Sequence, residues 1–352
     1  MNRLKLLTLL ICLATTCLAG KPSHVIKVKA GDVKSLIKAI VDANQLNADT
    51  ASERLYILIP NGTYDLGEIT LTTIAGHNIS LIGESMEGTV IVNAPKVENE
   101  GIAKTATLLN RGWNTYVQDL TLKNALDYYN SGPAGRAVCW QDKGNRTVFK
   151  RVRMLSYQDT YYSHSEECQH YFEDCEIHGT VDFLCGAGDV YFNRCLIVTE
   201  KCKEGAEKNV IAAPRTSVTE WGYVFNGCTI RNIVSPFYLA RAWHTHPRCV
   251  WMNTRLETPE QLLKERYDPY GLRTVDNDFF EFHTTDAQGH DITPQTNVVN
   301  FICKEESRQV ETILTAKEAK RFSLKNIFPD WKPGKVSAKE QKRAMKMKQA
   351  YL

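Results

Sequence analysis

A short pattern of apolar and polar positions recurs through the middle of the chain. Each copy has an aromatic or β-branched residue, an aromatic, two mostly polar residues, then Cys, Val or Leu, one further residue and an aliphatic one. The alternation of inward and outward positions predicts a short β-strand in each copy. The copies, of which the first and last are looser, span residues 116–122, 148–154, 171–177, 191–197, 224–230 and 250–256.

The spacing of these copies predicts a solenoid. Their second position falls at residues 117, 149, 172, 192, 225 and 251, which gives steps of 32, 23, 20, 33 and 26 residues. A minimum step near twenty, lengthened by inserted loops, fits a parallel β-helix whose equivalent positions stack about 4.8 Å apart. We therefore expect an all-β chain; the alternative is an antiparallel sandwich with chance similarity between strands.

Both ends of the repeat region have helical character, as expected of caps that cover the open faces of a solenoid. Asp32 begins a predicted helix whose apolar face consists of Val33, Leu36, Ile37, Ile40 and Val41. Residues 314–328 predict mixed turn and helix. The tail 332–352 carries seven Lys or Arg against one Glu. We interpret it as a solvated helix or frayed end, and an acidic polysaccharide is the alternative ligand. No linker divides residues 20–352, so we expect one domain.

The N-terminus has the pattern of a secretory signal peptide. Arg3 and Lys5 precede an apolar run over residues 6–14, and small residues surround Ala19. The run is too short to span a bilayer, so we expect cleavage of residues 1–19 and a secreted, extracellular protein. An uncleaved anchor and a bacterial lipoprotein signal are the alternatives. No later stretch reaches membrane-spanning length.

Composition and charge exclude several classes of protein. Of 352 residues, 43% are hydrophobic and 24% charged, which excludes a mostly disordered chain, a collagen and a coiled coil. The formal net charge of +3 gives no case for nucleic-acid binding. Nine of the 11 cysteines follow the signal segment, so at least one is unpaired unless it crosslinks two chains. Asn61, Asn78 and Asn145 lie in sequons, either as glycan sites or as unmodified turn residues.

Two aspartates share one offset within the repeat. Asp159 lies ten residues after Phe149, and Asp182 lies ten residues after Phe172. On consecutive coils the two carboxyl groups would be roughly one strand spacing apart, where they cannot both ionise easily. Such a pair separates an acid from a nucleophile or base. Gln158 could donate to a developing oxyanion; an unreactive stack of turn aspartates is the alternative.

Four segments resemble, in order along the chain, the signature blocks of the pectin methylesterase family. They are residues 62–64 (GTY), 158–160 (QDT), 179–183 (GTVDF) and 239–243 (LARAW), and the similarity runs from about residue 25 to 331. The resemblance implies a single-stranded right-handed parallel β-helix. It also implies an enzyme that acts on methylesterified homogalacturonan (pectin) and needs no cofactor or metal. Solenoids of this size often work as monomers, so we expect a monomer.

The resemblance also implies roles for individual residues. Asp182 would be the nucleophile and Arg241 would hold its carboxylate. Gln158 would stabilise the oxyanion, and Asp159 would act as acid and then as base. The residues that would line the sugar-binding cleft are Trp243, Tyr162 and Val181.

The chain departs from the family pattern at several positions, and two of them lie in the expected cleft. Arg136 stands where a second oxyanion-stabilising Gln is usual, and it could either donate to the substrate or block the cleft. Cys185 replaces a cleft aromatic. A β-helix glycoside hydrolase or lyase, or a catalytically impaired pectin-binding relative, are the alternative functions.

Overall fold

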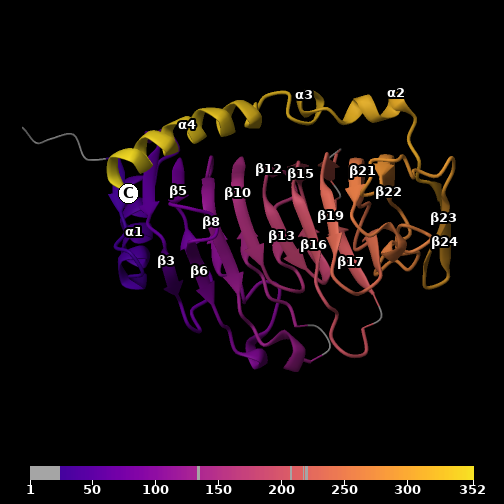
Figure 1. The fold of residues 1–352 in the computed structure, drawn as a ribbon, viewed down its shortest axis with the longest axis horizontal. Helices are drawn as coiled ribbons and strands as arrows, with labels where there is room; N and C mark the ends of the chain where they lie inside the picture. The colour runs from indigo at the N-terminus through magenta and orange to yellow at the C-terminus, as the bar shows by residue number, and fades with distance from the viewer. Residues whose placement is uncertain (1–23, 133–134, 207, 217, 219–220) are drawn as a thin grey trace, which may run out of the picture.

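The computed structural model describes residues 24–352 except 133–134, 207, 217 and 219–220. The expected signal peptide, residues 1–19, lies outside them. The described chain winds into a parallel β-helix, which confirms the predicted fold class (Figure 1). Two parallel sheets form its walls, and the side chains that point between them form one continuous core.

The larger sheet has 15 strands. Its strands in chain order are β1 (Val25–Lys27), β2 (Leu55–Ile59), β3 (Gly62–Asp65), β5 (Ile79–Gly83), β6 (Thr89–Asn93), β8 (Tyr116–Asn124), β10 (Thr147–Leu155), β12 (Gln169–Glu173), β13 (Glu176–Gly179), β15 (Asp189–Asn193), β16 (Leu196–Thr199), β18 (Tyr223–Asn226), β19 (Thr229–Asn232), β21 (Arg248–Leu256) and β22 (Asp278–Thr285).

The second sheet has seven strands in the order β20-β17-β14-β11-β9-β7-β4. These strands are β4 (Thr72–Ile74), β7 (Leu108–Asn110), β9 (Trp140–Asp142), β11 (Tyr161–Ser163), β14 (Val181–Gly186), β17 (Asn209–Pro214) and β20 (Phe237–Ala240). An antiparallel hairpin, β23 (Val298–Cys303) and β24 (Glu306–Glu311), follows the last coil. The short 3₁₀ turns are η1 (Val97–Asn99), η2 (Tyr128–Asn130), η3 (Pro259–Gln261) and η4 (Lys320–Phe322).

The repeat seen in the sequence is the register of the larger sheet. Its second positions pair directly from strand to strand, from Val117 on β8 to Trp251 on β21. The four phenylalanine rings between them stack face to face, with centroids 4.3 Å apart for Phe149 and Phe172 and 4.7 Å apart for Phe172 and Phe192. The stack continues through Phe225 to Trp251 at 4.4 and 3.7 Å. The predicted coil spacing is therefore confirmed.

Thiols pack beside this stack without pairing. All nine cysteines among the described residues are free and buried. Cys175 and Cys195 lie on neighbouring coils, because Leu196 donates its N–H to the carbonyl of Cys175. Burial raises the pKa of Cys195 well above its usual range, so this side chain behaves as a small apolar group.

Helix α1 (Val33–Leu46) covers the first coil, as predicted. The Asp32 side chain caps it by accepting from the Ser35 N–H at 3.1 Å. The buried face consists of Leu36, Ala39, Ile40 and Ala43. Val41 was expected on this face but is exposed. The small side chains of Ala39 and Ala43 let the helix pack closely on the side of Leu36 that faces away from Val41.

The C-terminal segment is longer than a cap. It continues through α2 (Ala316–Ala319), η4 and α3 (Leu324–Ile327) into α4 (Pro333–Tyr351), and it runs back along the solenoid to the first coils (Figure 1). Residues 314–352 are called the strap below. Apolar strap residues cover the outer face of the larger sheet and form a second core with it. The tail is thus a helix, as favoured from the sequence, but its inner face is buried.

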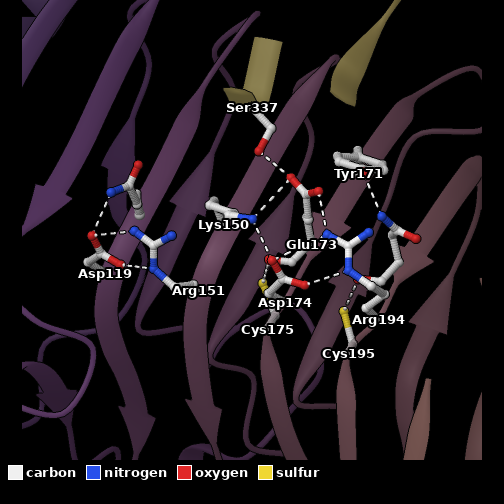
Figure 2. Close-up of polar contacts among 12 residues, drawn as sticks. Asp119, Lys150, Arg151, Tyr171, Glu173, Asp174, Cys175, Arg194, Cys195 and Ser337 are labelled. Carbon is white, nitrogen blue, oxygen red and sulfur yellow. Dashed lines mark hydrogen bonds and ion pairs between the residues drawn. The ribbon is translucent and has the colours of Figure 1, made fainter. Parts of the chain in front are cut away.

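Beneath the strap, consecutive coils carry opposite charges at one bend. Asp119, Arg151, Asp174 and Arg194 occupy equivalent positions, and all four have left-handed backbone conformations with φ between 49° and 55°. Such conformations cost about 1 kcal/mol or more outside glycine. The alternation of charge offsets this cost, since Arg151 Nε lies 2.6 Å from Asp119 and Arg194 Nε lies 3.0 Å from Asp174 (Figure 2).

The aromatic stack generates a stability prediction. Phe192→Ala removes a ring that contacts Phe172 and Phe225, so we expect the free energy of unfolding to fall by about 3–5 kcal/mol. Ile233→Ala, at an exposed position, is the control and should change stability by less than about 0.5 kcal/mol. Denaturant unfolding monitored by fluorescence measures both. Equal effects of the two variants would contradict a core that depends on the stack.

Candidate active site

The two aspartates singled out in the sequence lie on neighbouring coils of the smaller sheet. Asp159 lies two residues before the first residue of the strand β11, and Asp182 is the second residue of β14. Both have left-handed backbones, with φ of 59° and 54°. The pairing of β14 with β17 is irregular between Val181 and Leu184, so the strand bulges at Asp182. Bulges and uncommon backbone conformations recur where a strand aims a side chain at a functional site.

A guanidinium holds one of the two carboxylates. Arg241 follows β20, two strands away from β14, and donates from Nε to Asp182 Oδ1 at 2.7 Å and from Nη2 to Oδ2. On the intervening strand β17, Ala213 pairs with Cys185 of β14, and its small side chain leaves room for the arginine to reach back. Two parallel N–H donors fix the orientation of the carboxylate.

The surroundings of the other carboxyl group disfavour its charged form. Burial raises the pKa of Asp159 well above its usual range, and the nearby charge of Asp182 raises that pKa further. Arg136, Cys185 and Arg241 oppose the shift without reversing it. The site therefore combines an arginine-held carboxylate with a neighbouring carboxylic acid, which is the arrangement needed for a nucleophile beside a general acid.

A cysteine contacts the buried acid. Cys185 Sγ lies 3.7 Å from Asp159 Oδ1 and 3.6 Å from the carbonyl oxygen of Tyr161. Burial raises the pKa of the Cys185 thiol well above its usual range, so it is a weak donor and no nucleophile.

These residues surround one cavity of about 200 Å³. Its lining consists of Ile102, Arg136, Gln158, Asp159, Asp182, Cys185, Arg241, Trp243 and Leu272. The structure thus brings together six of the predicted site residues. Tyr162 and Val181 do not line the cavity. Tyr162 is buried beside Trp243, with ring centroids 6.5 Å apart, and Val181 is half-buried next to Asp182.

An ion pair within the wall was not foreseen from the sequence. Arg136 Nε and Nη2 donate to Glu100 at 2.9 and 2.6 Å, and the Arg136 backbone N–H donates to the same carboxylate at 3.0 Å. The hydrogen bonds from Arg136 hold the pKa of Glu100 below its usual range. The guanidinium lines the cavity with its charge largely balanced. Glu100 lies in an irregular segment outside the repeat, so no sequence signal connected it with Arg136.

The site offers no evident metal ligands. Within residues 24–352, gaps apart, no three His, Cys, Asp or Glu side chains are grouped so as to hold a metal ion. His246 Nε2 lies 2.8 Å from Asp278 Oδ2, so this imidazole already has a carboxylate partner. Separately, none of the described helices is long and apolar enough to cross a membrane.

Sequence comparison connects this site with a known family. The model of the pectinesterase family matches residues 25–271. Pectinesterase 3 of Solanum lycopersicum is 29% identical over 239 residues, which is 64% of this chain and 41% of that protein. The chain therefore spans less than half of the length of this relative, and the same is true of the other plant proteins at the head of the comparison.

Solved structures agree in fold. The pectin methylesterase from carrot superposes with a TM-score of 0.69 at 21% identity, over 90% of this chain and 94% of that one. A pectin methylesterase in complex with a hexasaccharide superposes with a TM-score of 0.62 at 24% identity, over 84% and 93% of the two chains. At these identities the likeness supports the parallel β-helix and nothing finer.

The raised pKa of Asp159 predicts a pH-dependent stability. Its carboxyl ionises more easily in the unfolded chain, so its stabilising contribution is complete below about pH 4 and is lost as pH rises through the folded-state pKa. Asp159→Asn cannot ionise. We expect this variant to melt a few degrees higher than the natural protein at neutral pH and to lose that advantage below about pH 4.

Thermal melts across this pH range test the prediction. Asp330→Asn is the control. Asp330 is exposed, so this variant and the natural protein should have the same melting temperature at every pH. An Asp159→Asn variant that melts lower than the natural protein at neutral pH would mean that the buried carboxyl is not a source of strain.

Proposed function

Because the chain belongs to the pectinesterase family, we propose that it removes methyl esters from homogalacturonan, releasing methanol and leaving pectate. The observation that carries the proposal is the pairing, in one cavity, of the arginine-held carboxylate of Asp182 with the buried carboxyl of Asp159. Ester hydrolysis by two carboxyl groups needs an ionised one as the nucleophile and a protonated one as the general acid.

In the first step, an Asp182 oxygen attacks the carbonyl carbon of a galacturonate methyl ester. The ester carbonyl oxygen becomes an oxyanion, which the Gln158 amide stabilises by hydrogen bonding; one such donor contributes about 3–4 kcal/mol to lowering a barrier. The bond to the methoxy oxygen then breaks. Asp159 gives its proton to that oxygen and methanol leaves, while Asp182 stays covalently bound to the sugar carboxyl group.

In the second step, water hydrolyses this intermediate. Asp159, now ionised, takes a proton from the attacking water, and its raised pKa makes it a competent base. The acyl bond to Asp182 breaks and both aspartates return to their first states. The galacturonic acid carboxyl group that is released keeps the second proton of the water and loses it to solvent, which leaves the carboxylate of pectate. Arg241 keeps Asp182 oriented throughout.

The sugar ring would lie against aromatic surface. Trp243 lines the cavity and Tyr162 supports it from behind, so the apolar face of a pyranose can pack on the indole. Val181 flanks Asp182 at the rim. Arg136 is held by Glu100 and would contact the substrate as a fixed donor.

Two alternatives act on the same polymer. A glycoside hydrolase or lyase would produce new chain ends instead of methanol. A catalytically impaired relative that only binds pectin is favoured by one observation, the Arg136–Glu100 pair in the wall of the cavity. We further propose that the protein is secreted and acts as a monomer.

Asp182→Asn should abolish methanol release. The amide keeps the shape of the side chain but is no nucleophile, so kcat for highly methylated pectin should fall by at least about 10³-fold. Asp174→Asn is the matched control, since Asp174 is also a left-handed aspartate bound to an arginine but lies outside the cavity. Methanol, reducing ends and unsaturated products are assayed separately. New chain ends without methanol would contradict the esterase assignment and favour a glycoside hydrolase or a lyase.

The pair in the cavity wall predicts a shifted pH profile. The charge of Arg136 lowers the pKa of Asp159, so its removal raises that pKa and moves the alkaline limb of kcat/KM to higher pH. The variant is Arg136→Gln, whose amide can still donate to Glu100; the Glu100 carboxylate that remains acts on the pKa of Asp159 in the same direction as the loss of the guanidinium. Activity at the optimum should change by less than about tenfold. A rise of more than about a hundredfold would identify the natural protein as impaired.

A further inference from the structure

The strap and the solenoid have net charges of opposite sign. Residues 314–352 carry 11 Lys or Arg and three Asp or Glu, whereas residues 24–313 carry 29 Lys or Arg and 37 Asp or Glu. The strap is therefore formally +8 and the solenoid it lies on is −8. A polyanion approaching this protein is repelled by the solenoid and attracted to the strap.

The inner side of α4 is fixed to the solenoid. Ser337 Oγ donates to Glu173 Oε2 at 2.5 Å, as Figure 2 shows, and Tyr56 donates its hydroxyl proton to Glu340 Oε2 at 2.7 Å. Near its end, Lys348 donates to the carbonyl oxygen of Glu84 at 3.0 Å. Ala344 is fully buried between these contacts. The helix is thus a rigid rod about 28 Å long rather than a frayed tail.

The outer side of α4 carries a straight row of lysines: Lys335, Lys339, Lys342 and Lys346. Their spacing of four, three and four residues keeps them within about 60° around the helix axis and about 5 Å apart along it. All four are exposed. In the described part of the chain, the ion pairs of α4 use Glu340, Arg343 and Lys348, and none involves this row.

The row continues along the rest of the strap. Further exposed basic residues are Lys317, Lys320, Arg321, Lys325 and Lys332. The only exposed acidic residues among the described part of the strap are Glu318 and Asp330. The strap runs along the solenoid to its first coils (Figure 1), so these exposed basic residues are distributed along its whole length, and together they are called the cationic band below. The strap packs on the larger sheet, and none of its residues lines the cavity.

We propose that this cationic band is a second binding surface, and that its ligand is de-esterified homogalacturonan, the polyanion that the proposed reaction produces. A linear polymer with one carboxylate on each sugar can follow a straight row of ammonium groups. A membrane surface fits less well, because helices that bind membranes insert an apolar face, and the apolar face of α4 is already packed on the solenoid. The proposal rests on the proposed function for the identity of the polymer.

Binding at the band would hold the protein beside its own product. The band and the cavity lie on different sheets, so a de-esterified stretch can occupy one while a methylated stretch occupies the other. Attachment to the first stretch raises the effective concentration of the second. Since the contacts are between exposed charges, they weaken with salt.

The test uses two variants of the full chain with the same change of net charge. The band variant carries Lys335→Glu, Lys339→Glu, Lys342→Glu and Lys346→Glu. The control variant carries Lys29→Glu, Lys34→Glu, Lys264→Glu and Lys304→Glu, four exposed positions scattered over the solenoid. The dissociation constant for fully de-esterified homogalacturonan is measured at low and at physiological salt. Methanol release from a short methylated oligogalacturonide is measured in parallel.

We expect the band variant to bind the polymer at least about tenfold more weakly than the natural protein at low salt, and the control less than about threefold more weakly. The salt dependence of binding should fall only in the band variant. Equal weakening in both variants would reduce the effect to net charge and overturn the proposal. Unchanged binding in both variants would also overturn it. So would tighter binding of the natural protein to phosphatidylserine vesicles than to the polymer, if the band variant loses that binding.

The methanol assay separates this proposal from the proposed function. Oligosaccharide turnover should be the same within about twofold in all three proteins, because none of the substituted lysines lines the cavity. If none of the proteins releases methanol, the esterase proposal fails, while the comparison of the two variants still decides whether the band binds the polyanion.

Discussion

In-register stacking of parallel strands is the constraint on which the rest of this molecule depends. Each coil places its residues directly over those of the coil before, at the strand spacing of about 4.8 Å. Phe149, Phe172, Phe192 and Phe225 gain from this arrangement, because flat rings stack on one another. Charged residues at equivalent positions are forced together in the same way, and there the geometry is unfavourable unless neighbours differ in charge.

The chain meets that difficulty differently in two places. Under the strap, Asp119, Arg151, Asp174 and Arg194 alternate in sign, so Arg151 pairs with Asp119 and Arg194 pairs with Asp174 (Figure 2). In the cavity, Asp159 and Asp182 are alike, and the repulsion remains. Arg241 from a later coil offsets the charge of Asp182, and burial together with this neighbouring charge raises the pKa of Asp159. The first arrangement stabilises the fold, and the second leaves an arginine-bound carboxylate beside a buried carboxyl group.

The strap completes the larger sheet and changes the electrostatics of the surface. Its apolar side covers the row of Tyr116, Val148 and Tyr171 that the open sheet would otherwise expose. Its basic side then becomes the outermost layer of that face. A solenoid with an acidic excess thereby acquires a positive surface remote from its cavity, without any change at the cavity itself.

The sequence by itself determined the winding of the coils and the adjacency of Asp159 and Asp182. Both follow from the repeat, because its spacing and the offset of each aspartate within it can be read from short stretches of sequence. It did not determine that Glu100 holds Arg136, that Val41 faces solvent, or that the strap returns along the solenoid. Those depend on contacts between segments with no common period, such as Tyr56 with Glu340, 284 residues apart. Only the packed structure decides such contacts, because burial and charge balance act between surfaces that meet after the coils have formed.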